Sequence, residues 1–499
     1  MTSTQSAEPL LTLLLSISIS LLAYFLTSSL VPFLSNDLVS KGLKGRDMLK
    51  PGFSSKKQED SNSDDEDEPG KKWLPEATGV IGASVYILLL SLFAPLPYLS
   101  SLLPSQSTSS STLPTPSYST TPPPPIGEGL EGSLQFPHHS FSTYLATLLS
   151  LLIATFLGFC DDVFDIRWRF KLPIPLIASV PLLVTYAAGH GVTDVVIPDI
   201  LGLRQLLGIV STKGLLHLGW IYYLYMSLLS IFTTNSINIL AGINGVEVSQ
   251  ALIISLSLIL NDLLYLTLTP SSILSLLPAS FQTDKLEGMS WTLGMANGSK
   301  ELEDRHLFSL YFMLPLVGVC LGLLKHNWYP ARSFIGDTFC YFSGMSFAVT
   351  SILSHYSKTL LLFFLPQIFN FLYSTPQLFG LVPCPRHRLP SLNRETGNLG
   401  VSWTVIKPSK QRNNREKMGV LILFMAEKIG LVKLEREEGE VRRCTNLTIL
   451  NLVLIWRGEM REDRLCKELI GIQVLGSVVG FAVRYGMGSW IYGMGSERR

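Results

Sequence analysis

The stretch from Leu10 to Val31, LLTLLLSISISLLAYFLTSSLV, is an almost unbroken run of apolar residues. A helix that crosses a bilayer needs about 20 such residues, so the run predicts a membrane span. No basic segment precedes it and no small-residue cleavage site follows it, which indicates an anchor and not a cleaved signal peptide. The whole chain agrees with this interpretation, because 47% of its 499 residues are hydrophobic and only 15% are charged.

Ten apolar windows of this kind predict an all-α polytopic membrane protein with about ten transmembrane helices. The loops after the first, third, fifth, seventh and ninth windows hold 28 Lys and Arg residues, whereas the other loops hold 6. The positive-inside rule therefore predicts that the first set is cytosolic and that both chain termini are lumenal. The windows are 9–34, 77–103, 140–160, 173–189, 214–234, 245–268, 307–325, 335–355, 359–382 and 466–487.

The chain divides into three predicted parts. Residues 1–382 form a membrane catalytic core, 383–465 form a cytosolic substrate-binding loop and small subdomain, and 466–499 form the last span and a lumenal tail. The middle part is expected to be a mixed α/β insertion before the last helix, because Val401–Ile406 predicts a strand and Glu416–Ile429 a helix.

Two insertions in the membrane core have compositions typical of disorder. The one near 58–68 is acidic, and the one near 104–135 is rich in Ser, Thr and Pro. Neither contains enough apolar residues to bury a core, so we expect both to be disordered.

Three carboxylates close the third predicted span, in the stretch GFCDDVFDIRWRFK from Gly158 to Lys171. Helical spacing puts Asp161 and Asp165 on one face, with Asp162 about 100° away. Such a group of hard oxygen ligands suits Mg²⁺ and the phosphates that it carries. Helix capping and snorkelling of interfacial charge are the alternatives.

Three asparagines and two glycines interrupt the apolar sequence between the fifth and sixth windows, in the stretch NSINILAGINGVE from Asn235 to Glu247. Buried amides are costly unless they are satisfied, asparagine carbonyls can ligate Mg²⁺, and glycine lets the backbone approach a ligand closely. Amide-mediated packing between helices is the alternative, and it accounts more easily for one asparagine than for three.

A single acid, Asp337, lies at the start of the eighth window, in the stretch NWYPARSFIGDT from Asn327 to Thr338. An ionisable residue at that depth is a candidate functional residue, although a helix N-cap is also compatible with it. Phe334 offers a ring for stacking on a base, or for packing in the membrane.

Two arginines and a histidine follow the ninth window in the stretch PCPRHRLP from Pro383 to Pro390, where prolines stiffen the loop. Arginine suits phosphate recognition, and attraction to anionic lipids is the alternative. All four polar stretches fall on the predicted cytosolic side, which indicates a single site. A transporter would instead be expected to place its charges along a path through the membrane.

Together these motifs resemble the eukaryotic, N-acetylglucosamine-specific branch of the polyprenyl-phosphate hexosamine-phosphate transferases, a glycosyltransferase family 4-like group. The resemblance covers about Gly42 to Tyr485, and NILAGINGVE and PRHR favour this branch over the bacterial muramyl-pentapeptide branch. It implies an endoplasmic reticulum membrane enzyme that makes GlcNAc-diphosphodolichol and UMP from UDP-GlcNAc and dolichyl phosphate, the first lipid-linked step of protein N-glycosylation. It implies no nucleic-acid partner, and a homodimer is possible.

The resemblance also implies roles for individual residues. Asn238 and Asp337 would hold Mg²⁺, Lys171 would contact the lipid phosphate, and Asp161 and Asp162 would complete the catalytic group. The implied substrate-binding residues are Arg46, Asp47, Met48 and Glu76 for the nucleotide sugar, Gly242, Asn244 and Phe334 for uracil, Phe232 and Asn235 beside the lipid phosphate, Arg386, His387 and Arg388 for the N-acetyl group, and Trp168 in the pocket wall. Asp165, also counted with the substrate-binding residues, departs from the family, in which relatives often carry Asn there: it would add metal affinity or pair with Arg167 or Arg169.

The predicted topology can be tested with two glycosylation sequons. Asn297-Gly-Ser299 lies in a predicted lumenal loop, and Asn446-Leu-Thr448 lies in the predicted cytosolic part. We expect glycan on Asn297 alone, because glycans are added in the lumen. Endoglycosidase shift assays on Asn297→Gln and Asn446→Gln would check this, and glycan on Asn446 would mean that the topology is inverted.

Overall fold

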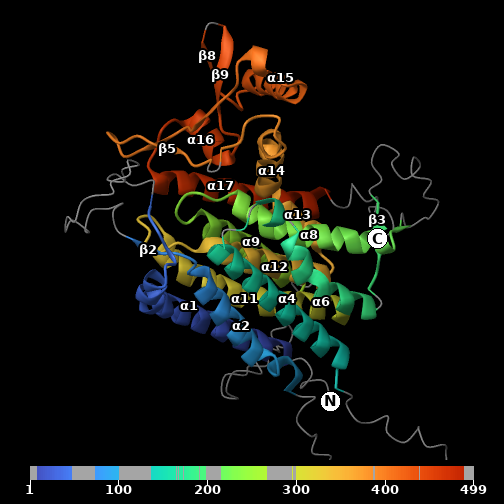
Figure 1. The fold of residues 1–499 in the computed structure, drawn as a ribbon. Coiled ribbons are helices and arrows are strands. Elements are labelled where there is room, and N and C mark those ends of the chain that lie inside the picture. Colours follow the sequence, from blue (N-terminus) through green and yellow to red (C-terminus); the bar gives the residue numbers. More distant parts are fainter. Residues whose placement is uncertain are drawn as a thin grey trace, which may run out of the picture.

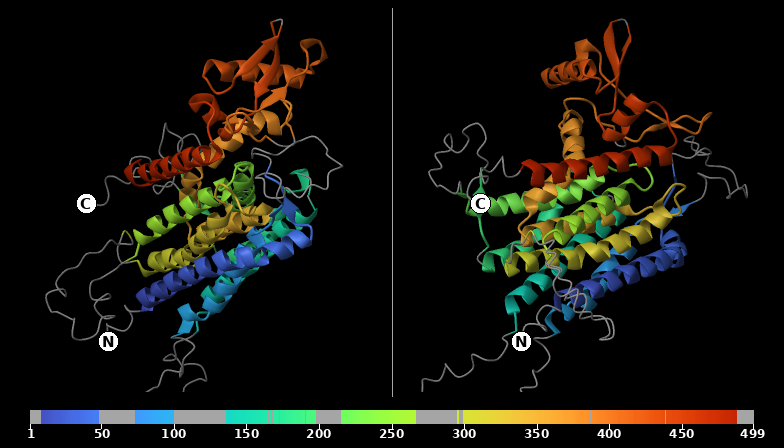
Figure 2. Two further views of the ribbon diagram at one scale, coloured as in Figure 1. Left: turned by 90° about the vertical axis from the view of Figure 1, so that its left-hand side faces the viewer. Right: turned by 180° about the vertical axis from the view of Figure 1, so that it is seen from behind.

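The computed structural model describes residues 8–47, 73–99, 136–164, 166, 168–171, 173–189, 191–197, 215–266, 295, 299–385, 388–437 and 439–487. In these ranges, long helices lie side by side in one bundle, and a small subdomain rises from one side of it (Figures 1 and 2). The predicted insertions near 58–68 and 104–135 lie outside the described residues, as does Asn297.

Every one of the ten apolar windows contains a described helix, and the ninth window is divided at Phe364. Among the described residues, six helices are long and apolar enough to cross a membrane, so the chain is a helical, multi-pass membrane protein. Those six are α1 (Glu8–Ser40), α2 (Gly79–Phe93, continued by η1, Leu96–Tyr98), α4 (His138–Phe164), α9 (Val246–Leu263), α11 (Lys300–Asn327) and α17 (Glu462–Phe481, continued by η4, Ala482–Met487); the shorter or less apolar ones are α6 (Ile174–Ala188), α8 (Trp220–Ile239), α12 (Gly336–Leu353), α13 (Ser357–Phe363) and α14 (Leu365–Leu378).

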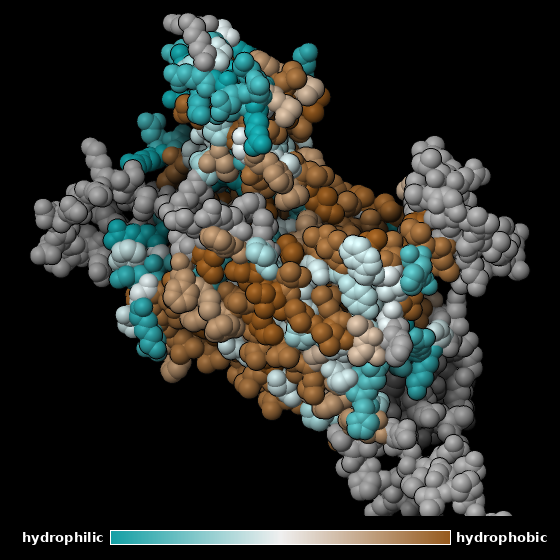
Figure 3. Space-filling model, turned by 45° about the vertical axis from the view of Figure 1, so that its right-hand side comes forward, coloured by the Kyte–Doolittle hydropathy of each residue, from teal (hydrophilic) through white to brown (hydrophobic). Residues whose placement is uncertain are grey.

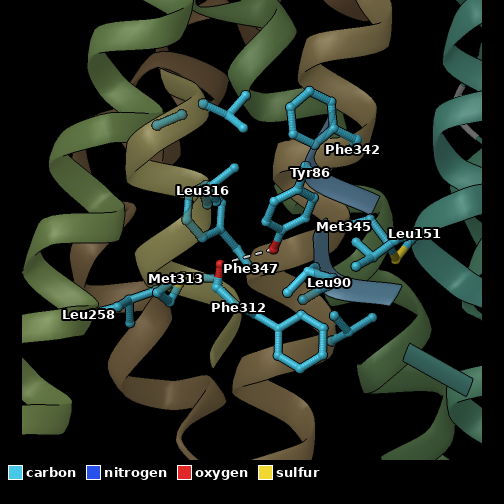
Figure 4. Packing of buried hydrophobic residues seen from close by; sticks show 14 of the residues in the cluster. Tyr86, Leu90, Leu151, Leu258, Phe312, Met313, Leu316, Phe342, Met345 and Phe347 are labelled. Atoms are coloured by element: carbon cyan, nitrogen blue, oxygen red, sulfur yellow. Dashed lines mark hydrogen bonds between the residues drawn. The ribbon is translucent and has the colours of Figure 1, made fainter. Parts of the chain in front are cut away.

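Helix α12 is the centre of the bundle. Every residue from Thr338 to Ile352 is buried, and α4, α8, α2 and α6 surround the helix. Buried polar side chains in the surrounding core bond to backbone: the Tyr86 hydroxyl donates to the carbonyl oxygen of Phe312 at 3.0 Å (Figure 4). A helix buried on all sides is rigid at its ends, so it can hold a functional side chain in one position.

The subdomain between α14 and α17 is mixed α/β. Its three-stranded antiparallel sheet has the order β7-β9-β8, and α15 packs on one face of that sheet. Its elements are β5 (Ser391–Leu392), β6 (Leu399–Gly400), β7 (Trp403–Val405), η3 (Ser409–Gln411), α15 (Asn414–Lys428), β8 (Leu434–Glu437), β9 (Glu440–Thr445) and α16 (Ile449–Arg457). The strand and helix expected from the sequence thus exist, with the strand shorter and the helix beginning two residues earlier.

Two further hairpin-like pairs lie at the ends of the bundle. Strand β1 (Lys44–Gly45) pairs with β2 (Leu74–Pro75), and β3 (Asp194–Val196) pairs with β4 (Leu215–His217), both antiparallel. The first pair brings the segment after α1 beside the segment before α2. A short helix, α5 (Trp168–Lys171), lies between α4 and α6.

Close packing of α12 against α8 can be tested at Gly344. A methyl group there would come within 2.4 Å of the Thr234 Cα atom, which is backbone and cannot move aside cheaply. We expect Gly344→Ala to reduce the free energy of unfolding by about 1–3 kcal/mol. Thermal unfolding in detergent would measure this. Gly471→Ala is the matched control, because no atom lies within 4 Å of its added methyl group, and an equal loss in both variants would refute the packing argument.

Candidate active site

Asp337, the first acidic residue of α12, is held by side chains from two other elements. The Lys171 Nζ atom of α5 lies 2.6 Å from its Oδ2 atom, and the Asn238 Nδ2 atom at the end of α8 donates to its Oδ1 atom at 2.6 Å. The Asp337 side chain remains 27% exposed. A carboxylate, an ammonium and an amide thus meet at one end of the bundle, with part of the carboxylate open to a ligand.

Asp161 is the second carboxylate bound to Lys171. Its Oδ1 atom lies 3.0 Å from Lys171 Nζ, and its Oδ2 atom accepts a hydrogen bond from the Tyr341 hydroxyl at 3.3 Å. Burial lowers the pKa of Lys171, but the charges of Asp337 and Asp161 outweigh it, so the pKa is raised. Lys171 is therefore a fixed cation beside Asp337.

Asp162 caps the N-terminus of α12. One of its oxygens accepts the backbone N–H of Asp337 at 2.5 Å, and the other accepts the backbone N–H of Thr338 at 3.0 Å and the Thr338 hydroxyl. A carboxylate is favourable there because it satisfies free N–H groups and the helix dipole. Gly336 has a φ of 74°, and a methyl group on it would come within 2.6 Å of the Asp162 carboxylate, so the cap depends on a glycine.

The loop between α8 and α9 is held by three acids, two of which come from distant parts of the chain. The Asn244 N–H donates to Glu462 Oε1 at 2.7 Å, and its Nδ2 atom donates to Asp47 Oδ2 at 2.8 Å. The Gly242 N–H donates to Glu247 Oε1 at 3.2 Å. These bonds bring the segment after α1 and the start of α17 to the same loop.

The first hairpin borders the same end of the bundle. The Phe334 N–H donates to the Pro75 carbonyl oxygen at 2.9 Å, which places Phe334 beside Glu76. Two causes raise the pKa of Glu76: burial is the larger, and the negative charge of Asp337 is the smaller. The Arg46 guanidinium lies 4.2 Å from the centre of the Trp73 ring, which fixes it by a cation–π contact.

Three other predicted residues are described. Phe232 packs on Phe364 with ring centres 5.9 Å apart, Asn235 donates its amide to the Ile231 carbonyl oxygen at 2.9 Å within α8, and Trp168 lies in α5. Arg388 is mostly buried, and its Nη1 atom has no hydrogen-bond partner in the described part of the chain. Met48, Asp165, Arg386 and His387 lie outside the described residues.

Comparison with known proteins gives a consistent result. A model of glycosyl transferase family 4 matches residues 144–355. The chain is 39% identical to the UDP-N-acetylglucosamine–dolichyl-phosphate N-acetylglucosaminephosphotransferase of Schizosaccharomyces pombe, over 98% of this chain and 94% of the relative. Identity to the proteins of the same name is 35% in Saccharomyces cerevisiae (96% and 93% of the two chains) and 38% in Dictyostelium discoideum (93% and 86%).

The chain belongs to this N-acetylglucosaminephosphotransferase family. The resemblance inferred from the polar motifs is therefore confirmed. The matched family 4 segment contains three of the four motifs and the Lys171, Asn238 and Asp337 group, whereas the loop with Arg388 lies beyond it.

Sequence reasoning gave no role to three residues that shape this site: Glu247 and Asn327 stand within the polar stretches quoted above, and Glu462 lies outside them. Glu462 and Glu247 hold the loop of Asn244, and Asn327 accepts the Gly245 N–H at 3.0 Å. The signal available was weak: each is a polar residue at the edge of an apolar window. Such a residue looks like ordinary interfacial charge until the fold shows its partner.

The capping role of Asp162 predicts a stability effect. In Asp162→Asn, one carboxylate oxygen becomes an amide N–H₂ that faces the N–H groups of Asp337 or Thr338. We expect the free energy of unfolding to fall by about 1–3 kcal/mol, because a buried donor is left without an acceptor. Chemical denaturation followed by tryptophan fluorescence would measure it. Asp37→Asn, on the exposed side of α1, is the control and should leave the free energy of unfolding unchanged. An equal loss of unfolding free energy in both variants would contradict the capping role.

Proposed function

We propose that this chain transfers N-acetylglucosamine 1-phosphate from UDP-GlcNAc to dolichyl phosphate, giving GlcNAc-diphosphodolichol and UMP. The observation that carries the proposal is the meeting of Asp337, Lys171 and Asn238 at the end of the membrane bundle, in a chain that belongs to the N-acetylglucosaminephosphotransferase family. One substrate is lipid and the other is water-soluble, so the reaction needs a site at a membrane boundary.

The chemistry of the donor groups fits Mg²⁺. Mg²⁺ takes oxygen ligands, and commonly one or two from the protein with the rest from substrate phosphates and water. The carboxylate of Asp337 and the amide oxygen of Asn238 would hold it, and the bound ion would neutralise charge on the pyrophosphate. The described residues contain no group of three or more acidic, histidine or cysteine side chains that could hold a metal by themselves, which agrees with a site completed by substrate.

Phosphoryl transfer asks the protein mainly for positioning and charge neutralisation. A phosphate monoester has a second pKa of about 6, so dolichyl phosphate needs no strong base near neutral pH. Lys171 would hold that phosphate. An oxygen of dolichyl phosphate would then attack the sugar-bearing phosphorus of UDP-GlcNAc. The new P–O bond forms as the bond to UMP breaks. Asp161 and Asp162 would act by orienting Lys171 and the α12 terminus, and not as nucleophiles.

The neighbouring groups would hold the nucleotide sugar. The loop of Gly242 and Asn244, tied to Asp47, would recognise uracil, with Phe334 stacked on the base. Arg46 and Glu76 border the same end of the bundle. The loop of Arg388 would contact the N-acetyl group, and its buried, unpartnered guanidinium nitrogen supports a role in binding.

The proposed setting is the endoplasmic reticulum membrane. We propose ten spans, with α6, α8, α12 and the divided pair α13–α14 added to the six long apolar helices, and the active site facing the cytosol. The distribution of Lys and Arg among the loops supports that orientation. A transporter is the second candidate, but the described site gathers at one end of the bundle.

Asp337→Ala tests the function. We expect transfer of radiolabel from UDP-GlcNAc to dolichyl phosphate, and the matching release of UMP, to fall by about 10²-fold or more, because the carboxylate that would hold Mg²⁺ and the partner of Lys171 are both lost. Chelation with EDTA should stop the reaction of the wild-type protein, and added Mg²⁺ should restore it. Glu435→Gln, on exposed β8, is the control. Unchanged UMP release by Asp337→Ala would overturn the assignment.

A further inference from the structure

Helix α15 carries an exposed apolar stripe. Met418, Leu421, Phe424 and Met425 are each between 39% and 59% exposed. Their spacings of three and four residues place them on one face of the helix, since an α-helix has 3.6 residues per turn. The opposite face is already used, because Gly419, Val420 and Leu423 pack into the core of the subdomain.

Two more large side chains extend this stripe at the end of α15. Ile429 is 70% exposed, and Trp456 of α16 is 61% exposed. The Trp456 Nε1 atom donates to the Gly430 carbonyl oxygen at 2.9 Å, which fixes the indole beside Ile429. We name these six residues the α15 patch: Met418, Leu421, Phe424, Met425, Ile429 and Trp456. A contiguous apolar surface of this kind is a mark of an interaction site.

The α15 patch lies beside a helix whose outer face meets lipid. Phe369 and Leu372 of α14 are exposed on the outside of the bundle, as lipid-facing residues of a membrane helix are. The hydroxyl of Tyr373, next to them in sequence, donates to the Leu431 carbonyl oxygen at 2.5 Å, just after α15. Tyr373 precedes the end of α14 at Leu378 by more than one turn, or about 7 Å along the helix.

The segment just after α15 therefore contacts α14 at a residue more than one turn before that helix ends. The first half of α15 also packs closely against the chain just after α14. At Gly419, an added methyl group would come within 2.0 Å of the Leu381 carbonyl oxygen. Figure 3 shows hydrophobic surface continuing from the belt around the bundle onto the near side of the subdomain. The patch is thus continuous with the surface that lipid covers.

The charges around α15 suit an anionic surface. Its two acids are already paired: Glu416 lies 2.7 Å from the Lys407 ammonium, and Glu427 pairs with Arg436. Arg415, Lys417 and Lys428 have no acidic partner within the described ranges. The exposed apolar face and free basic residues of α15, with Trp456 of α16 beside them, together suit contact with the headgroup region of a bilayer.

We infer that the α15 patch docks on the phospholipid leaflet beside α14. The subdomain would then be held at two points, by its chain connections to the bundle and by its own contact with lipid. Since α15 packs on Leu381 and Val382, docking would also fix the height of the Pro383–Pro390 loop above the membrane. This inference concerns the surface and does not depend on the proposed reaction.

Photo-crosslinking of the full chain in its native membrane tests the inference. A benzoylphenylalanine residue would replace Leu421, Leu372 or Glu435 in separate variants. Leu372 on α14 is the lipid-facing reference, and Glu435 on exposed β8 is the water-facing reference. After irradiation and proteolysis, mass spectrometry would count peptides that carry a phospholipid.

We expect the yield of lipid adducts at position 421 to be close to that at 372 and several-fold above that at 435. A yield at 421 as low as that at 435 would overturn the inference, because the patch would then face water. A crosslink from 421 to a second copy of the chain or to another protein, in place of lipid, would also overturn it. Repeating the experiment with Met425 replaced guards against a local folding defect at 421, and it should give the same ranking.

Discussion

The N-terminus of α12 is the point on which the rest of the site depends. Asp162 binds the free N–H groups there, and Asp337, one residue into the helix, is bound by Lys171 and Asn238. Three separate parts of the chain, α4 with α5, α8 and α12, are thereby fixed to one another within hydrogen-bond distance. Burying these charges and amides is unfavourable, and their mutual hydrogen bonds and ion pairs offset it only when all of the partners are present.

The central helix makes this arrangement rigid. It is buried along its length, and glycines at its contacts with α4 and α8 allow the helices to approach closely: added methyl groups on Gly158 and Gly344 would come within 3 Å of backbone atoms. Rigid packing of this kind positions a reactive group without further adjustment when substrates bind. The loop of Asn244 beside it is tied by Asp47 and Glu462, and in the proposed function this loop would hold the nucleotide sugar.

The helical fold, and the residues that meet in the candidate site, could be predicted in large part from the sequence. Long apolar windows predict helices because the bilayer leaves the backbone no alternative, and asparagines or acids within such windows stand out because their burial is costly. Asn238, Lys171 and Asp337 were found in this way and from the family resemblance. What could not be predicted was pairing over long distances. Nothing in the sequence around Asp162 distinguishes a cap for a helix 175 residues further along from a metal ligand.

The same limit applies to the surface of the subdomain. The stretch NREKMGVLILFMAEK predicts a helix, but its apolar residues run almost continuously, and only the fold shows which of them are covered by the sheet and which remain open. Burial in the tertiary structure therefore decides the interpretation of α15, in the same way that it decides the role of Asp162.

The bond between the Asn244 N–H and Glu462 has a consequence for how the protein is made. Asn244 leaves the ribosome long before Glu462, which opens the last described helix. A chain that is still being synthesised can insert its earlier helices and bring Asp337 to Lys171, yet the loop of Asn244 lacks its final partner until Glu462 has been made, 218 residues later. The order of synthesis thus delays completion of this loop until the last helix has been inserted.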